Sequence, residues 1–197
     1  MVYNWYIKNT MNIMHKLNFI PVGKEKNIKK FFMFLYYTIT KLFVILIINL
    51  LLHTFKEALV LCLFFMLLRG FAQGIHAKKN SICWLVTLSI FIPIPLLIKY
   101  LVIHKIFLYI AYPIMIINYL LFSPNDTQKR SMKNKFKRIS FKIIGTIIVT
   151  SFFVYTILYQ NHLIIYSMFY SSIIALISFH PLTYKLFGQH SYNYRNL

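Results

Sequence analysis

Acidic residues are scarce in this sequence of 197 residues. Glu25, Glu57 and Asp126 are the only three, against 22 Lys and Arg, so the formal net charge is +19. Such a charge is typical of proteins that bind nucleic acid. Here, however, apolar segments of membrane-spanning length divide the basic residues into separate blocks. We therefore expect no nucleic-acid partner.

Cysteine is scarce as well, and two further sequence signals are missing. Cys62 lies in an apolar run and Cys83 in a polar stretch, which does not suggest a disulfide framework. The N-terminus has no apolar run followed by a small-residue cleavage site, so we expect no cleavable signal peptide. No nucleophile-elbow sequence is present, which argues against a serine hydrolase.

Apolar residues, by contrast, make up 59% of the chain and aromatic residues 18%. A bilayer is spanned by about 20 consecutive apolar residues. The sequence therefore predicts an all-α, polytopic integral membrane protein with about six transmembrane or re-entrant helices. The six apolar runs are 31–52, 58–68, 82–98, 106–122, 143–159 and 163–179.

These runs predict how the domain is organised. We expect residues 31–180 to form a single transmembrane domain, with a polar loop at 69–83 and a basic loop at 123–142. Residues 1–30 carry aromatic residues on roughly one helical face, which fits either a helix lying in the membrane interface or a disordered segment. Residues 181–197 are expected to form a tail.

Two of the runs have features that affect how they cross the bilayer. The run at 58–68 is only eleven residues long, so it either crosses a locally thinned bilayer or re-enters the same face. The run at 82–98 contains Pro93, which leaves the Ser89 carbonyl without its helical donor and should kink the helix.

The basic residues predict the orientation of the chain. If all six runs cross, 18 of the 22 Lys and Arg residues lie on one side and three on the other, with Lys41 inside a span. Positive residues concentrate on the cytoplasmic side. Both termini and the loop at 69–83 are therefore predicted to face the cytoplasm, where Cys83 stays reduced.

The polar loop at 69–83 holds His76 and Cys83, and a histidine beside a cysteine can make it a nucleophilic thiolate. In an unbroken helix the two residues would lie about 10.5 Å apart along the axis, too far for direct proton transfer. We therefore expect residues 71–79 to form a loop or a broken helix, and a new helix to begin at Asn80 or Ser81. Cys83 would then lie in its first turn, where the helix dipole stabilises an anionic sulfur. A purely structural role for both residues stays open at this point.

The string Arg69, Gly74, His76-Ala77 and Cys83 resembles the signature of the accessory gene regulator B family. The hydrophobic plan around it agrees, and Ser123-Pro124 followed by a basic run resembles a later loop of those proteins. In this sequence Gln73 and Gly74 stand where many members have two glycines. The resemblance implies an integral-membrane cysteine endopeptidase that processes quorum-sensing pro-peptides in the cell membrane of a Gram-positive bacterium.

The resemblance also implies roles for individual residues. His76 and Cys83 would form the catalytic pair, within one chain or, in the alternative arrangement, between the two chains of a homodimer. The substrate would be a short AgrD-like pro-peptide with an acidic C-terminal tail. Residues expected to contact it are Arg69, Gly74, Lys129, Arg130 and Lys133. The basic loop also has a simpler interpretation as a topology determinant that touches anionic lipid of the bilayer.

Two other kinds of function were considered. Histidines 53, 104 and 162 fall in short connections, but only Glu57 accompanies them, so we expect no metal site and no cofactor. A non-catalytic transporter, or a scaffold that binds acidic peptides, would also use a basic cytoplasmic face. Both predict that Cys83 is dispensable, whereas a peptidase requires it.

Overall fold

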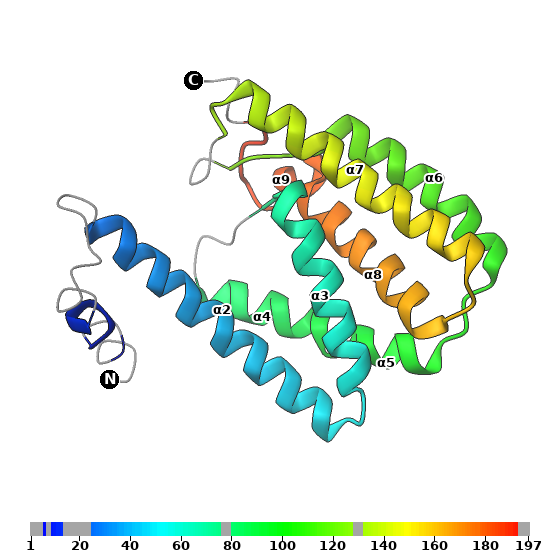
Figure 1. Ribbon diagram of the computed structural model, residues 1–197, viewed down its shortest axis with the longest axis horizontal. Coiled ribbons are helices and arrows are strands. Elements are labelled where there is room, and N and C mark those ends of the chain that lie inside the picture. Colours follow the sequence, from blue (N-terminus) through cyan, green and yellow to red (C-terminus); the bar gives the residue numbers. More distant parts are fainter. Residues whose placement is uncertain (1–5, 7–8, 14–24, 76–79, 128–131, 193–197) are drawn as a thin grey trace. The chain divides into compact units, whose positions relative to one another are not determined.

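The computed structural model consists of helices. It describes residues 6, 9–13, 25–75, 80–127 and 132–192, and no strand occurs within those ranges. The predicted all-α class is therefore confirmed (Figure 1). The helices are α2 (Glu25–Leu51), α3 (Phe55–Ala72), α4 (Asn80–Phe91), α5 (Pro93–Tyr100), α6 (Lys105–Phe122), α7 (Lys135–Leu158), α8 (His162–Phe179) and α9 (Pro181–Leu186).

The chain divides into two compact units, residues 1–48 and 49–197. In the first unit, residues 9–13 are helical, and the ring of Tyr6 lies 5.1 Å from that of Tyr36 on α2. Helical structure agrees with the interfacial helix expected near the N-terminus. Its position at a membrane surface and the expected domain division at residue 31 stay predictions.

Four helical segments are long and apolar enough to cross a membrane: Ser81–Tyr100, Lys105–Phe122, Lys135–Leu158 and His162–Phe179. A shorter apolar helical stretch, Leu35–Leu51, lies within α2. The polytopic membrane architecture is thus confirmed, and the expected count of about six crossings is approximate.

Helix α3 is longer than the eleven-residue apolar run that predicted it. Its 18 residues include Glu57 in the first turn and Arg69 in the last. At 1.5 Å per residue it extends about 27 Å, close to the roughly 30 Å thickness of a bilayer core. This length favours a full crossing over a re-entrant segment.

Helix α8 is the centre of the second unit. In the candidate membrane span formed by α8, 56% is buried inside the protein, whereas 17–28% is buried in each of the other three candidate spans. It packs on α3, α5, α6 and α7, and α3 is its most extensive partner (Figure 1). Small, fully buried residues such as Ser171 and Ala175 allow neighbouring helices to approach closely in a membrane. The outer faces of the remaining spans are left for lipid.

The predicted proline break is confirmed, because α4 ends at Phe91 and α5 begins at Pro93. Pro95 also has no N–H to donate to the Phe91 carbonyl four residues earlier. The Nδ2 of Asn49 donates to that carbonyl instead, at 3.0 Å. Thr54 Oγ1 in turn donates to Asn49 Oδ1 at 2.8 Å. Buried side chains thus satisfy the backbone where the helix is broken.

Two segments expected to be loop or tail are more ordered than the sequence suggested. The predicted basic loop at 123–142 ends earlier, because α7 begins at Lys135 rather than at residue 143. Asn134 Oδ1 accepts a hydrogen bond from Lys137 N at 3.2 Å and caps this extension. The expected tail likewise contains α9, whose Tyr184 is buried.

We expect Asn49→Ala to destabilise the protein in detergent by about 1–3 kcal/mol, because it leaves the buried Phe91 carbonyl without a donor. Asn118→Ala is the matched control, since Asn118 Nδ2 donates only to Ile114 in its own helix. Thermal unfolding followed by size-exclusion chromatography measures both variants. Equal melting temperatures would show that Asn49 does not support the break.

Candidate functional site

The segment that follows α6, residues 123–127, is buried. Ser123, Asn125, Asp126 and Thr127 are each at most 5% exposed, although their polar character had suggested an exposed loop. Asp126 Oδ2 accepts from Met132 N at 3.0 Å. The segment also forms an isolated parallel bridge with the end of α3, between Asn125 and Gln73. It therefore belongs to the structure around the polar loop that begins at Arg69.

Asn125 connects four parts of the second unit. Its backbone N–H donates to the Ala72 carbonyl at 3.3 Å, and its Nδ2 donates to the Phe179 carbonyl at 2.8 Å. Its carbonyl accepts from Tyr184 Oη at 2.9 Å, and its Oδ1 accepts from Tyr192 N at 2.9 Å. The ends of α3 and α8, helix α9 and the C-terminal segment are thus held by one fully buried residue, and we call this set of bonds the Asn125 junction.

The Tyr184 hydroxyl is well suited to its place in the Asn125 junction. Burial raises the pKa of this hydroxyl above its usual range, an effect that the positive charge of Arg69 opposes. The hydroxyl therefore keeps its proton and remains a donor to the Asn125 carbonyl.

Arg69 fastens the beginning of the polar loop to α8. Its Nη1 donates to Ser178 Oγ at 2.8 Å and to the carbonyl of Gln73. Its Nη2 donates to the Ile75 carbonyl at 2.6 Å, and Ile75 N donates to the Ser178 carbonyl at 2.7 Å. The guanidinium therefore holds the chain that leads into the motif. Its expected contact with substrate stays a prediction, and such a contact would have to coexist with these bonds.

The backbone of this loop start requires a glycine at residue 74. Gly74 is buried and has a φ of 122°, which side-chain-bearing residues rarely adopt. A Cβ there would lie 2.6 Å from the Ser178 carbonyl oxygen and would overlap Nη1 of Arg69. Gln73 also has a positive φ, 56°, in the region that glycine occupies most easily. The absence of a side chain at Gly74 thus allows the backbone to approach the Arg69 guanidinium and the Ser178 carbonyl closely.

Cys83 is the fourth residue of α4, which begins at Asn80 as expected. Its side chain is half-buried, whereas Cys62 in α3 is only 4% exposed. The Cys83 carbonyl accepts from Thr87 Oγ1 at 2.6 Å within the helix. Of the two thiols, Cys83 is therefore the accessible one, and it lies in a first helical turn as the sequence predicted.

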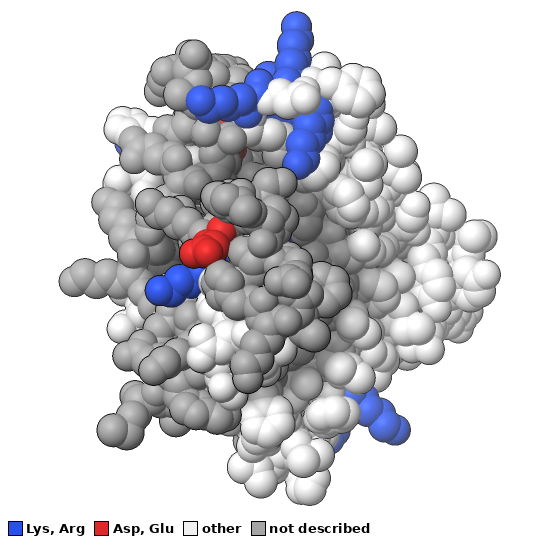
Figure 2. All heavy atoms as spheres, turned by 60° about the vertical axis from the view of Figure 1, so that its left-hand side comes forward, with Lys and Arg blue, Asp and Glu red and all other residues white. Residues whose placement is uncertain are grey.

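The remaining predicted site residues are placed as follows. His76, Lys129 and Arg130 lie outside the described residues. Lys133 is exposed just before α7. In Figure 2 a group of Lys and Arg side chains lies at the top of the view, the height at which α7 begins in Figure 1, and other Lys and Arg side chains lie at the left and the lower right. Within the described part of the chain, no group of three or more His, Cys, Asp or Glu residues is placed to hold a metal ion.

A family model described as "Accessory gene regulator B" matches residues 6–183, most of the chain. This protein belongs to the accessory gene regulator B family. Together with its apolar helices, membership makes it a membrane protein of the accessory gene regulator system. The resemblance inferred from the motif at 69–83 is therefore confirmed.

Curated proteins with related sequences agree with this assignment. A putative AgrB-like protein of Clostridium acetobutylicum is 27% identical over 81% of this chain and 77% of its own length. One of Lactiplantibacillus plantarum is 35% identical over 58% of each chain. The accessory gene regulator protein B of Staphylococcus saprophyticus is 28% identical over 61% of this chain and 63% of its own. No solved structure matches the chain.

Sequence reasoning missed the residues of this family member that hold the motif in place. Asn125, Ser178 and Tyr184 are distant in sequence from Arg69, and each acts through a partner that only the fold brings near. The one available signal was the run of polar residues at 123–127, which follows an apolar span directly. Such a run is also typical of an exposed loop, so it did not indicate burial.

We expect Gly74→Ala to lower stability by about 1–3 kcal/mol, because the backbone conformation becomes strained and the Cβ displaces the Arg69 guanidinium. Gly70→Ala is the matched control: Gly70 lies in α3 with nothing near its Cβ position, so alanine should be neutral or stabilising by up to about 1 kcal/mol. Thermal unfolding in detergent measures the stability of both variants. A Gly74→Ala protein as stable as Gly70→Ala would contradict the observed loop geometry.

Proposed function

We propose that this protein is a membrane cysteine endopeptidase of a quorum-sensing system. It removes the acidic C-terminal tail from a short pro-peptide and promotes cyclisation of the remainder. The observation that carries the proposal is the position of Cys83, the accessible thiol, in the first turn of the helix that follows the Arg69 loop. Membership in the accessory gene regulator B family supports it.

The proposed chemistry uses two residues. His76 takes the proton of the Cys83 thiol, and the sulfur attacks the carbonyl at the end of the signal sequence. The tetrahedral intermediate collapses to a thioester, and His76 returns the proton to the departing amine of the tail. A thiol or hydroxyl within the tethered peptide then attacks the thioester, closes the ring and releases Cys83. Tethering favours this step because it gives the internal nucleophile a high effective concentration.

The loop geometry suggests how these residues are positioned. Arg69 and Gly74 fix the chain up to Ile75 against α8, and Cys83 follows in α4. His76 is next to Ile75 in sequence, so these bonds hold the chain directly before the proposed base. We propose that the pair forms within one chain. A homodimer in which His76 of one chain serves Cys83 of the other is the alternative.

We propose a cytoplasmic location for this end of the second unit. This proposal is supported by the Asn125 junction, which joins the end of α3, the segment 123–127 and Tyr192. The excess of Lys and Arg in these segments favours the cytoplasmic side.

The rival function is a transporter or scaffold whose basic face attracts acidic peptides without cleaving them. It needs the basic residues and leaves Cys83 without a role. Replacing this thiol therefore separates the two functions directly.

We expect Cys83→Ala and His76→Ala each to abolish release of the acidic tail while the protein still accumulates in the membrane. Cys62→Ala is the matched control, since this thiol is buried in α3 away from solvent and should retain most activity. Co-expression with a pro-peptide tagged at its C-terminus, followed by immunoblotting of the released fragment, measures the three variants. Normal cleavage by Cys83→Ala would rule out the peptidase.

Exposed basic residues near the start of α7 are proposed to attract the acidic tail. Neutralising Lys133 and Lys135 to glutamine should raise the KM for the pro-peptide several-fold and leave kcat nearly unchanged, and added salt should reduce the difference by screening. The double variant Lys56→Gln, Lys105→Gln is the control. Both lysines are exposed, and they lie at the N-terminal ends of α3 and α6, whereas the Arg69 loop and the segment 123–127 follow the C-terminal ends. An equal rise in KM in the control would show that attraction by these two residues is not specific.

A further inference from the structure

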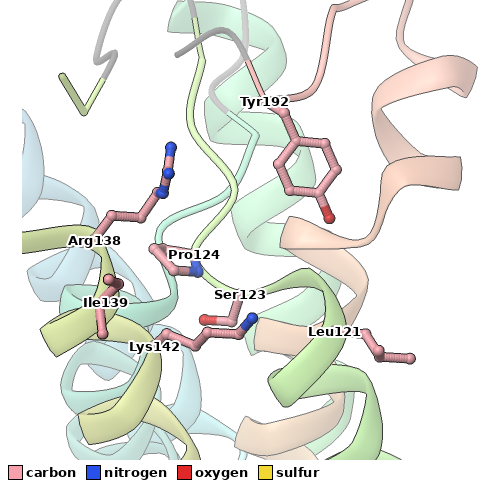
Figure 3. A pocket seen from close by; sticks show the side chains of 7 residues that line it. All are labelled: Leu121, Ser123, Pro124, Arg138, Ile139, Lys142 and Tyr192. Atoms are coloured by element: carbon pink, nitrogen blue, oxygen red, sulfur yellow. The ribbon is translucent and has the colours of Figure 1, made fainter. Parts of the chain in front are cut away.

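A pocket of about 220 Å³ lies between the end of α6 and the first turns of α7 (Figure 3). Its polar lining comes from Ser123, Arg138, Lys142 and Tyr192, and its apolar lining includes Leu121 and Ile139. One water molecule needs only about 10–15 Å³ of such space. The pocket is therefore large enough for a polyatomic group with several waters.

The charge around the pocket is positive. Arg138 and Lys142 are four residues apart on α7, so they lie on one face of the helix, and like charges at this spacing are unfavourable. No Asp or Glu is among the described residues that line the pocket. Both side chains would attract an anion in the pocket.

Among the residues that line the pocket, Ser123 has a buried hydroxyl with no hydrogen-bond partner in the described part of the chain. Ser123 is 4% exposed, and its Oγ forms no hydrogen bond with any described residue. Figure 3 shows the side chains of Ser123 and Lys142 among those that line the pocket. A buried donor without an acceptor costs free energy, and an anionic oxygen in the pocket would provide the acceptor.

The surroundings of the pocket identify the kind of anion. Leu121 and Ile139 are 62% and 46% exposed, and the apolar outer faces of α6 and α7 continue from them along Ile117 and Ile143, which are also exposed. Both helices are candidate membrane spans with little of their surface buried in the protein. The pocket thus lies where lipid-facing surface meets the basic end of the helices, at the level of the lipid headgroups.

We propose that the pocket binds the phosphate of an anionic phospholipid, with Lys142 and Arg138 pairing with the phosphate and Ser123 donating to one of its oxygens. The acyl chains then lie against the exposed residues of α6 and α7. A soluble acidic peptide could use the charges but would gain nothing from this apolar surface, which is why we favour the lipid. Because Ser123 precedes Asn125 by two residues, the bound lipid also stabilises the segment that forms the Asn125 junction.

The test compares lipids in detergent micelles with purified full-length protein. Phosphatidylglycerol should raise the melting temperature in a saturable manner, whereas phosphatidylcholine should not, and native mass spectrometry should detect retained phosphatidylglycerol. Lys142→Gln should weaken the binding about fivefold, the effect of roughly one lysine near an anionic surface. Lys185→Gln, an exposed lysine of α9 outside the pocket, is the control and should bind normally.

Ser123→Ala gives a sharper readout because its two effects have opposite signs. Without lipid the variant should be as stable as the wild type or more stable, since an unpaired buried hydroxyl has been removed. Its stabilisation by phosphatidylglycerol should nevertheless be smaller. Ser140→Ala, which loses only a bond to Phe136 in its own helix, should show the normal lipid response. This pair remains informative even if Lys142→Gln does not fold.

Three results would overturn the proposal. Equal stabilisation by both lipids, or an unchanged response in Lys142→Gln and Ser123→Ala, would show that this pocket is not the lipid site. Full stabilisation by inorganic phosphate alone, with loss of retained lipid, would make it a site for free phosphate. Displacement of phosphatidylglycerol by an acidic peptide of the tail type would assign the pocket to peptide instead.

Discussion

The structure of the second unit depends on satisfying backbone polar groups where helices end near the membrane. Within a span each N–H and C=O is paired inside its own helix, but the chain between helices has no such pairing. Asn125 and Arg69 supply it. The first joins the ends of α3 and α8, helix α9 and the C-terminal segment, and the second binds the carbonyls of the loop that leads toward Cys83.

This arrangement changes how the motif of the family is understood. An arginine, a glycine and a cysteine in one short stretch suggest a catalytic group, yet here Arg69 and Gly74 fit each other: the absent Cβ of one makes room for the guanidinium of the other. With only three acidic residues in the chain, Arg69 is bound by carbonyl and hydroxyl oxygens.

Features that depend on neighbouring residues were predictable from the sequence. The apolar runs, the helix start at Asn80 and the break at Pro93 follow from hydrophobicity, capping and the missing proline N–H, and each is observed. Features that depend on distant partners were not predictable. The burial of residues 123–127 requires Phe179, Tyr184 and Tyr192. The early start of α7 is an exception, since its cap Asn134 is local. The pocket around Ser123 combines residues from three separate segments, so no local sequence pattern predicted it.

The Asn125 junction also has a consequence for the order in which the protein is made. Its partners extend from Ala72 to Tyr192. The complete set of bonds can form only after Tyr192 has been synthesised and α8 has entered the membrane. Until then the loop before Cys83 lacks its full support. Assembly of this end therefore follows the synthesis of α8 and α9, and a chain truncated before Tyr192 would contain the motif without the complete set of bonds that holds it.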